Sequence, residues 1–324
     1  MESVACDLCG GTDQEIVVSQ TDIYHGVTSE FFNVVRCVHC GLHFLNPRPA
    51  EDEISIYYSR QYDFHRRRSR LELFALGLLQ KLANSRLHNI LNLVPLLNKK
   101  LVTYIKPPVA DPVIDIIAKS PNKVALLDIG CGAGITAHLW GSKGALSHYK
   151  RIANVFGVEV SETARKVLER NGVIAYDSIH AVAGEMRFDI IRMNWSLEHV
   201  HRPSEYFEFI ARSLTGDGRA IIAVPNFEGL LYRIAIDSVE VPLHLYHFRR
   251  EDIENYSRRF GLKVLSAVTF SYPQMYRFLS ERNQRLGGVF SDMSLLEAYY
   301  FQRTLCRFDS LGTGNDMIFV LSRA

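Results

Sequence analysis

The chain has 324 residues, of which 47% are hydrophobic and 22% are charged, and its formal net charge is +2. A chain of this length can bury a large core, and these fractions are ordinary for a globular protein, which excludes a low-complexity chain. The small net charge indicates no general preference for nucleic acid or anionic lipid.

The first residues show neither the basic nor the apolar region of a secretory signal. No apolar run reaches the roughly 18 residues of a membrane span, because Lys81 and Arg86 interrupt the most hydrophobic region. We therefore expect a cytoplasmic protein.

Residues 1–60 contain two similar Cys-x-x-Cys knuckles, each followed by glycine, with short strands expected at 16–18 and 31–36. Four thiolates at this spacing suit a tetrahedral Zn²⁺ with no open coordination position, so the metal is expected to be structural. Three alternatives remain open: unmetallated cysteines, a rubredoxin-like iron centre, and replacement of one cysteine by His25, His39 or His43. The predicted ligands are Cys6, Cys9, Cys37 and Cys40.

Residues 61–110 are predicted to form a helical linker or cap. A basic cluster between Arg66 and Arg70 precedes a leucine-rich stretch with helical spacing, which ends before Pro107. This stretch either packs against the following domain or lies on a membrane surface through residues 66–105, where the arginines would face anionic lipid.

From residue 111 to 324, strand and helix signals alternate, which predicts a parallel α/β sheet. The segment 271–315 is too long for a simple connection and is expected to contain helices over the ligand edge of the sheet. The expected strands are 124–129, 155–159, 173–176, 188–193, 218–224, 262–270 and 317–321.

The apolar run 124–129 is followed by Gly130, Gly132 and Gly134, and the next strand ends at Glu159. Closely spaced glycines let a strand-to-helix turn approach a nucleotide-like ligand, and a carboxylate ending the next strand can accept hydrogen bonds from a ribose. The dinucleotide pattern Gly-x-Gly-x-x-Gly is absent, which disfavours a nicotinamide cofactor.

With these motifs, the chain resembles the class I S-adenosylmethionine-dependent methyltransferases. The resemblance implies a Rossmann-like, doubly wound seven-stranded sheet whose last strand is antiparallel. The front of the chain is similar to a bacterial subgroup with a small N-terminal zinc-ribbon module, often associated with sugar, polysaccharide or secondary-metabolite modification. The matching segments are 127–134, 157–159, 188–191, 197–200 and 216–219, with 41–49, Tyr57-Tyr58, 244–248 and 312–316 for the subgroup.

The resemblance also implies roles for single residues in binding S-adenosylmethionine. Asp128 would orient the glycine loop or reach the ammonium group of the cofactor through water, and Glu159 would bind the ribose hydroxyls. Asp177 would reach the adenine amino group, and Asn194 would lie beside the sulfonium, next to Trp195.

Methyl transfer to a hydroxyl or a carbon acid needs a general base, and histidine suits this role because its pKa lies near the working pH. The candidates are His244 first and His199 second, then His247 and His201, and Glu198 would orient a histidine. The expected acceptor is a hydroxyl or carbon of a nucleotide-activated or lipid-linked sugar, or a small natural product.

Two other functions remain open. One is an RNA methyltransferase that grips nucleic acid with the zinc knuckles, although the acidic residues of the first module disfavour a nucleic-acid partner. The other is a non-catalytic binding protein on the same scaffold.

Overall fold

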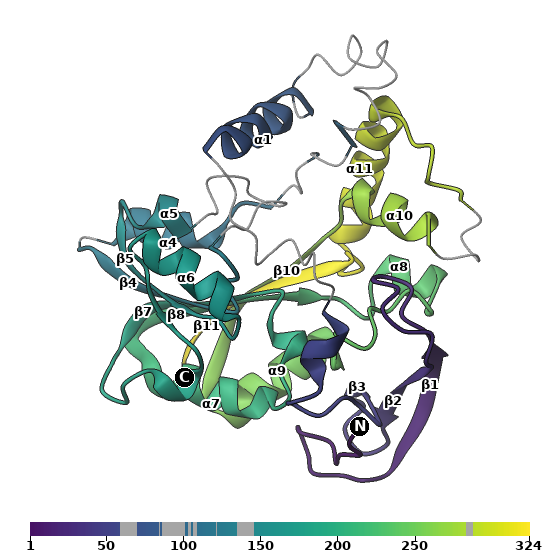
Figure 1. The fold of residues 1–324 in the computed structure, drawn as a ribbon, viewed down its shortest axis with the longest axis horizontal. Helices are drawn as coiled ribbons and strands as arrows, with labels where there is room; N and C mark the ends of the chain where they lie inside the picture. Colours follow the sequence, from purple (N-terminus) through teal and green to yellow (C-terminus); the bar gives the residue numbers. More distant parts are fainter. Residues whose placement is uncertain are drawn as a thin grey trace.

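The computed structural model describes residues 1–58, 70–83, 85, 101–102, 105, 109–120, 122–134, 146–282 and 288–324. Within these residues the strands form two sheets, one large and one small (Figure 1). Most of the basic cluster and the later part of the leucine-rich stretch lie outside the described residues.

The large sheet has seven strands among the described residues, in the order β10-β11-β8-β7-β4-β5-β6. Strands β7, β4, β5 and β6 run parallel to their neighbours, whereas β11 is antiparallel to both β8 and β10. The predicted fold class, including the antiparallel last strand, is confirmed. The strands are β4 (Val124–Ile129), β5 (Ala153–Val158), β6 (Ile174–Tyr176), β7 (Phe188–Asn194), β8 (Leu214–Pro225), β10 (Leu262–Phe270) and β11 (Asp316–Arg323).

The central strands are apolar along their whole length because both faces of the sheet are covered. Successive residues alternate between two cores: Leu126 packs toward α4 and α5, whereas Leu127 packs toward α7 and α9. Figure 1 shows α4, α5 and α6 on one face of the sheet and α7 and α9 on the other. These helices are α4 (Pro112–Lys119), α5 (Leu146–Tyr149), α6 (Glu162–Arg170), α7 (Pro203–Ser213) and α9 (Arg250–Arg259).

The small sheet combines the N-terminal residues with a strand from far along the chain. Its order is β1-β2-β3-β9, and β9 pairs antiparallel with β3, with His43 opposite His247. The N-terminal module, residues 1–58 as described, therefore shares a sheet with the segment that carries two of the predicted histidines. The strands are β1 (Gln14–Gln20), β2 (Phe32–Cys37), β3 (His43–Leu45) and β9 (Tyr246–His247).

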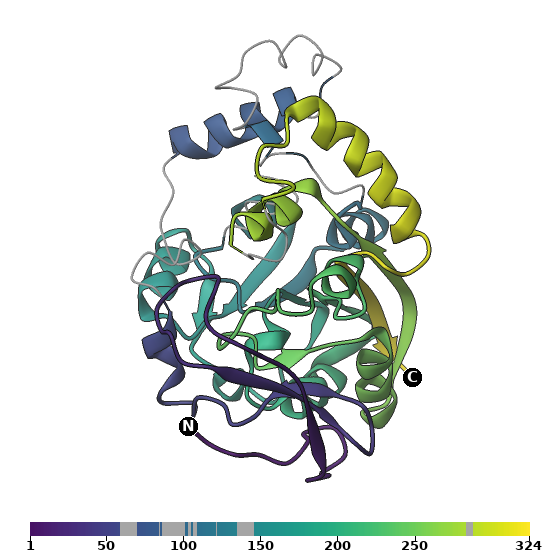
Figure 2. The same cartoon turned by 90° about the vertical axis from the view of Figure 1, so that its right-hand side faces the viewer.

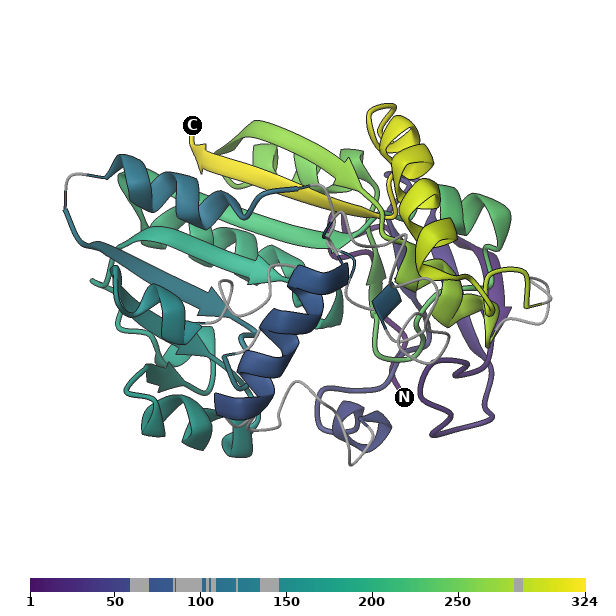
Figure 3. The ribbon, with the colours of Figure 1, turned by 90° about the horizontal axis from the view of Figure 1, so that it is seen from above.

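The segment expected to cover the sheet contains two helices, α10 (Pro273–Ser280) and α11 (Leu295–Asp309), which contact each other through Tyr276 and Phe301 with ring centroids 5.0 Å apart. Helix α1 (Arg70–Ala83) packs its last turn near α11, where Ala83 and Leu295 share a small core. Figure 2 shows α1 at the opposite end of the molecule from the N-terminal strands, and Figure 3 looks down on α1 and α11.

Four short helical segments complete the described residues: η1 (Ile54–Tyr57), η5 (Ile179–Ala181), η6 (Leu197–His199) and α8 (Leu230–Ile234). On α1, the side chains of Leu71, Phe74 and Leu78 are 81%, 74% and 49% exposed. None of the helices in the described part of the chain is long and apolar enough to cross a lipid bilayer.

Candidate functional site

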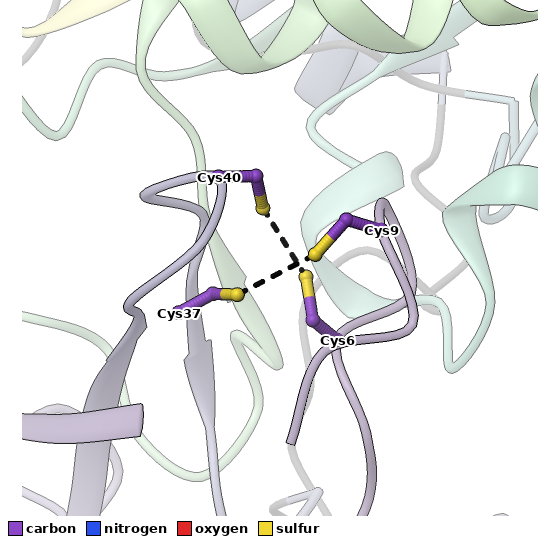
Figure 4. Close-up of side chains that lie close together, drawn as sticks. All are labelled: Cys6, Cys9, Cys37 and Cys40. Atoms are coloured by element: carbon purple, nitrogen blue, oxygen red, sulfur yellow. Dashed lines mark hydrogen bonds between the residues drawn. The ribbon is translucent and has the colours of Figure 1, made fainter. Parts of the chain in front are cut away.

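Four cysteine sulfurs come together at the end of β2 that carries Cys37. The four side chains point toward one another (Figure 4). All four sulfurs lie within 4.8 Å of one another, and in a tetrahedral Zn²⁺ site with Zn–S bonds of about 2.3 Å the sulfurs would be about 3.8 Å apart. The donor set therefore fits a metal ion. The closest pairs are Cys6–Cys40 at 3.4 Å and Cys9–Cys37 at 3.5 Å.

The glycine after each knuckle has a backbone conformation that L side chains rarely adopt. Gly10 and Gly41 have φ of +76° and +78°, and their N–H groups donate to the carbonyls of Cys6 and Cys37. This turn aims both sulfurs of a knuckle to the same side, which is the reason for a glycine at this position.

The predicted cofactor loop lies at the carboxyl end of β4. Gly130, Gly132 and Gly134 have φ of +73°, +53° and +80°, and a Cβ on Gly130 would stand 2.3 Å from the Cβ of Ser196. The amide N–H of Gly132 donates to Glu159 Oε2 at 2.7 Å. The structure therefore brings the loop and Glu159 together, at the edge where parallel sheets bind ligands.

Asp128 does not face solvent but forms a buried ion pair beneath the loop. Its carboxylate accepts hydrogen bonds from Arg192 Nε at 3.1 Å and Nη2 at 2.5 Å. The two residues are 2% and 0% exposed, and the Arg192 guanidinium lies over the ring of Tyr149. The ion pair joins β4 to β7 directly before the glycine loop.

Asn194 ends β7, next to the loop. It is 9% exposed, and neither amide atom has a hydrogen-bond partner within the described residues. Trp195 follows with φ of +50°, a rare conformation for a bulky residue that is typical of functional sites. Its indole N–H donates to Asp316 Oδ1 at 2.7 Å. Asp177, in contrast, is exposed and accepts from the hydroxyl of its neighbour Ser178.

Three of the predicted histidines lie together beside the end of β7. The rings of His199 and His244 are 4.7 Å apart, and those of His244 and His247 are 6.3 Å apart. The Nδ1 of His199 lies 3.0 Å from the carbonyl oxygen of Leu243. Because a carbonyl only accepts, Nδ1 carries the proton and Nε2 keeps the lone pair of a base. His201 is not in this cluster, since its Nε2 contacts the carbonyl of Pro49.

Burial sets the charge of these histidines. It lowers the pKa of His199 to about 3 and lowers the pKa of His244 and, more strongly, that of His247. All three imidazoles are therefore neutral at pH 7, which is the state in which histidine can accept a proton.

Two carboxyl groups, those of Glu198 and Glu240, lie beside His244, and a third, that of Asp316, contacts Trp195. Glu198 is 1% exposed, neither of its oxygens has a partner within the described residues, and burial raises its pKa well above the ordinary value. Burial also raises the pKa of Asp316 to about 7. Glu240 differs: burial opposes its ionisation, but His244 and His25 lower the pKa of its carboxyl below the ordinary value.

Comparisons with known proteins agree with this arrangement. A family model described as a methyltransferase domain matches residues 101–267. The chain belongs to this methyltransferase family. The ubiquinone biosynthesis O-methyltransferases of Pseudomonas aeruginosa (strain UCBPP-PA14) and Pseudomonas fluorescens (strain SBW25) are 28% and 27% identical over 165 residues, which cover 45% of this chain and 68% of each relative.

Among solved structures, a methyltransferase from Thermotoga maritima is 15% identical, with a TM-score of 0.44, and covers 78% of this chain and 98% of its own. A methyltransferase from Clostridium acetobutylicum ATCC 824 is 12% identical, with a TM-score of 0.42, and covers 66% of this chain and 89% of its own. Both are described as dependent on S-adenosylmethionine.

The residues at the site fit S-adenosylmethionine, the methyl donor that the sequence motifs predict for this methyltransferase. The loop has no room for a side chain at Gly130, Glu159 offers a buried carboxylate, and Asn194 has an unpaired buried amide. Bound S-adenosylmethionine supplies an electrophilic methyl group on a sulfonium.

Sequence reasoning missed several groups of the methyltransferase site. Glu240 and His25 were not expected there, nor was Asp316 as a partner of Trp195. Glu240 stands four residues before His244, a spacing at which a carboxylate can support a histidine within a helical turn. No comparable signal marks His25, which reaches the site only through the tertiary structure.

Proposed function

We propose that this methyltransferase transfers a methyl group to a hydroxyl or carbon of a sugar, on a nucleotide-activated or lipid-linked glycan, or of a small natural product. The observation that carries the proposal is the cluster of neutral imidazoles at the carboxyl end of β7, beside the cofactor loop. An acceptor hydroxyl must lose a proton, and in this proposal His244 takes it, with His199 as the second candidate.

The residues around the histidines can hold a polar acceptor. Burial, together with Asp316, Glu240 and Glu198, raises the pKa of Tyr232 far enough that its phenol stays protonated as a donor. The protonated Glu198 offers a further donor. Such mixed donors and acceptors suit a polyhydroxylated molecule.

A second acceptor class follows from the relatives named as ubiquinone biosynthesis O-methyltransferases, which suggest an aromatic hydroxyl. The centroid of the Phe227 ring lies 5.5 Å from that of Tyr232 and 5.5 Å from that of His247, and this ring could stack on an aromatic acceptor.

Transfer of labelled methyl from S-adenosylmethionine to a panel of nucleotide sugars, glycans, catechols and RNA tests these proposals. Label in sugars supports the first acceptor class and label in catechols supports the second. Label only in RNA would overturn both. The assay is run with and without EDTA, because the donor atoms of Glu198, His199 and His244 lie within 4.8 Å of one another. Loss with EDTA and recovery with Mg²⁺ would replace acid–base catalysis by a metal.

We further propose that the four cysteines hold one structural Zn²⁺, and that the protein works in a reducing compartment such as the cytoplasm. Metal analysis of the purified protein should give one zinc per chain. Replacing Cys9 and Cys37 by serine should abolish it, whereas zinc retained by that double variant would refute the site.

The alternative for residues 66–105, contact with a membrane surface, remains a proposal, supported by the exposed Leu71, Phe74 and Leu78 on α1. Flotation with vesicles of phosphatidylglycerol tests it. A protein that stays at the bottom of the gradient would overturn it.

A further inference from the structure

The N-terminal module contacts residues 238–240, which precede His244 in the chain. Three consecutive positions of this segment each bind a side chain from the end of β1 or the turn that follows it. The pairs are Gln20 with the carbonyl of Val239, Tyr24 with the carbonyl of Ser238 at 2.7 Å, and His25 Nε2 with Glu240 Oε1 at 2.9 Å.

The turn that presents His25 is itself held in place. Asp22 is 5% exposed, and its carboxylate accepts hydrogen bonds from the backbone N–H of His25 at 2.8 Å and of Val27 at 2.9 Å. At the far end of the same segment, β9 pairs with β3, which places His247 opposite His43. The N-terminal module therefore contacts the segment 238–247 at both ends, through side-chain hydrogen bonds at residues 238–240 and through strand pairing at residues 246–247.

The two carboxylate oxygens of Glu240 contact two different histidines. Oε1 meets His25, and Oε2 lies 3.5 Å from His244 Nε2. The other groups facing His244 are Glu198, whose Oε1 lies 4.0 Å from Nε2, and the rings of His199 and His247. Glu240 is the member of this set that carries a negative charge at pH 7.

A carboxylate in this place does two things for a histidine base. At 3.5 Å from Nε2, its negative charge favours the tautomer of His244 that carries the proton on Nε2 and the lone pair on Nδ1. It also stabilises the imidazolium that forms when Nδ1 takes a proton. A hydrogen bond to His25 keeps the carboxylate from rotating away. The same logic applies to any acid–base pair in which a third group orients the base.

We propose that the N-terminal module is part of the active centre: Glu240 is a positioning residue for His244, and His25 anchors Glu240. This inference rests on the proposed function, in which His244 receives the acceptor proton. It assigns to the zinc-binding module a task beyond its own stability.

Four variants test the arrangement, each assayed with the acceptor that the panel identifies. Glu240→Gln should lower kcat by about 10²-fold while the affinity for S-adenosylmethionine, measured by calorimetry, stays within about twofold of the wild type. Glu240→Asp keeps the charge and should recover part of kcat. His25→Gln should lower kcat severalfold, and the double variant Glu240→Gln/His25→Gln should be no slower than Glu240→Gln alone.

A matched control is His180→Gln, which removes the histidine of an exposed pair with Glu205 and should leave kcat unchanged. Wild-type kcat in Glu240→Gln, or effects of the two single variants that multiply in the double variant, would overturn the inference. Wild-type kcat in His244→Ala would instead overturn the proposed base.

Nitrogen NMR of ¹⁵N-histidine-labelled protein gives a readout that needs no acceptor. Glu240→Gln should shift the His244 resonances away from the tautomer protonated at Nε2, and His180→Gln should not. Unchanged His244 resonances in Glu240→Gln would refute the contact.

Discussion

Replacing Arg192 by methionine tests the ion pair beneath the cofactor loop. Both Arg192 and Asp128 are buried, so the substitution leaves a carboxylate without its partner in a place that water does not reach. Breaking a buried pair from one side typically costs about 3–5 kcal/mol of the free energy of unfolding. For a chain of 324 residues that corresponds to a fall in Tm of about 4–7 °C.

A double-mutant cycle separates the effect of the charges from the effect of packing. Arg192→Met with Asp128→Asn removes both charges, and the double variant should be destabilised by about 1–3 kcal/mol less than the sum of the single variants. Urea unfolding at constant pH measures all three. Arg250→Met is the matched control, because Arg250 pairs with Glu254 at 2.8 Å on the surface and should cost less than about 1 kcal/mol.

Two outcomes would refute this reasoning. If Arg192→Met costs no more than the surface control, the pair does not hold β4 against β7. If the single-variant effects simply add, the two charges do not interact as the distances imply.

Three more substitutions probe the site. Glu159→Gln should weaken binding of S-adenosylmethionine about 10- to 100-fold in calorimetry, because charged hydrogen bonds of about 1.5–3 kcal/mol are lost. Gly130→Ala should abolish that binding, since the new Cβ would collide with Ser196 in a backbone conformation that disfavours any side chain. For Asp316, burial raises the pKa to about 7 from an ordinary 3.8, so the folded state favours the protonated acid and this group's contribution to stability falls as the pH rises from about 4 to 7. Asp316→Asn should therefore reduce the loss of stability between pH 5 and pH 8, seen in urea unfolding, by roughly 3 kcal/mol.

The first two of these substitutions each have a matched control. Glu162→Gln, on the exposed side of α6, should leave cofactor affinity unchanged, and Gly184→Ala has no atom within 4 Å of the new Cβ. Full cofactor affinity in Glu159→Gln or Gly130→Ala would mean that the loop is misassigned. An undiminished pH dependence in Asp316→Asn would assign it to another group.

The large sheet could be predicted because its signals are local. The strand expected at 262–270 matches β10 at both ends, since Gly261, at φ of +67°, ends the preceding helix and a continuous β-prone run follows. Strand β8 starts four residues earlier than expected because it continues through Gly216 and Gly218, which look like turn residues and lie where a bulge interrupts the register with β7.

The second sheet was only half predictable. β9 has two residues and no periodicity of its own, and it exists because β3 offers it an edge. The same holds at the site: the motif residues 130–134 and Glu159 come together through short-range geometry, whereas Glu240 and His25 meet across 215 positions of sequence. A sequence pattern reveals residues that belong to one helix, strand or turn. It does not reveal residues that come together only through the tertiary structure.

The pairing of β3 with β9 also constrains how the protein is made. During synthesis from the N-terminus, the cysteine knuckles and β1–β3 emerge long before Tyr246 and His247, which supply the last strand of that sheet. Until then one edge of β3 has no β9 to pair with, and unpaired edges invite aggregation. The pairing of β3 with β9 closes a loop of about 200 residues, and such long-range pairing is slow. The small sheet is therefore completed only after most of the large sheet has been synthesised. A fragment that ends before residue 246 should therefore aggregate even with its zinc ligands intact.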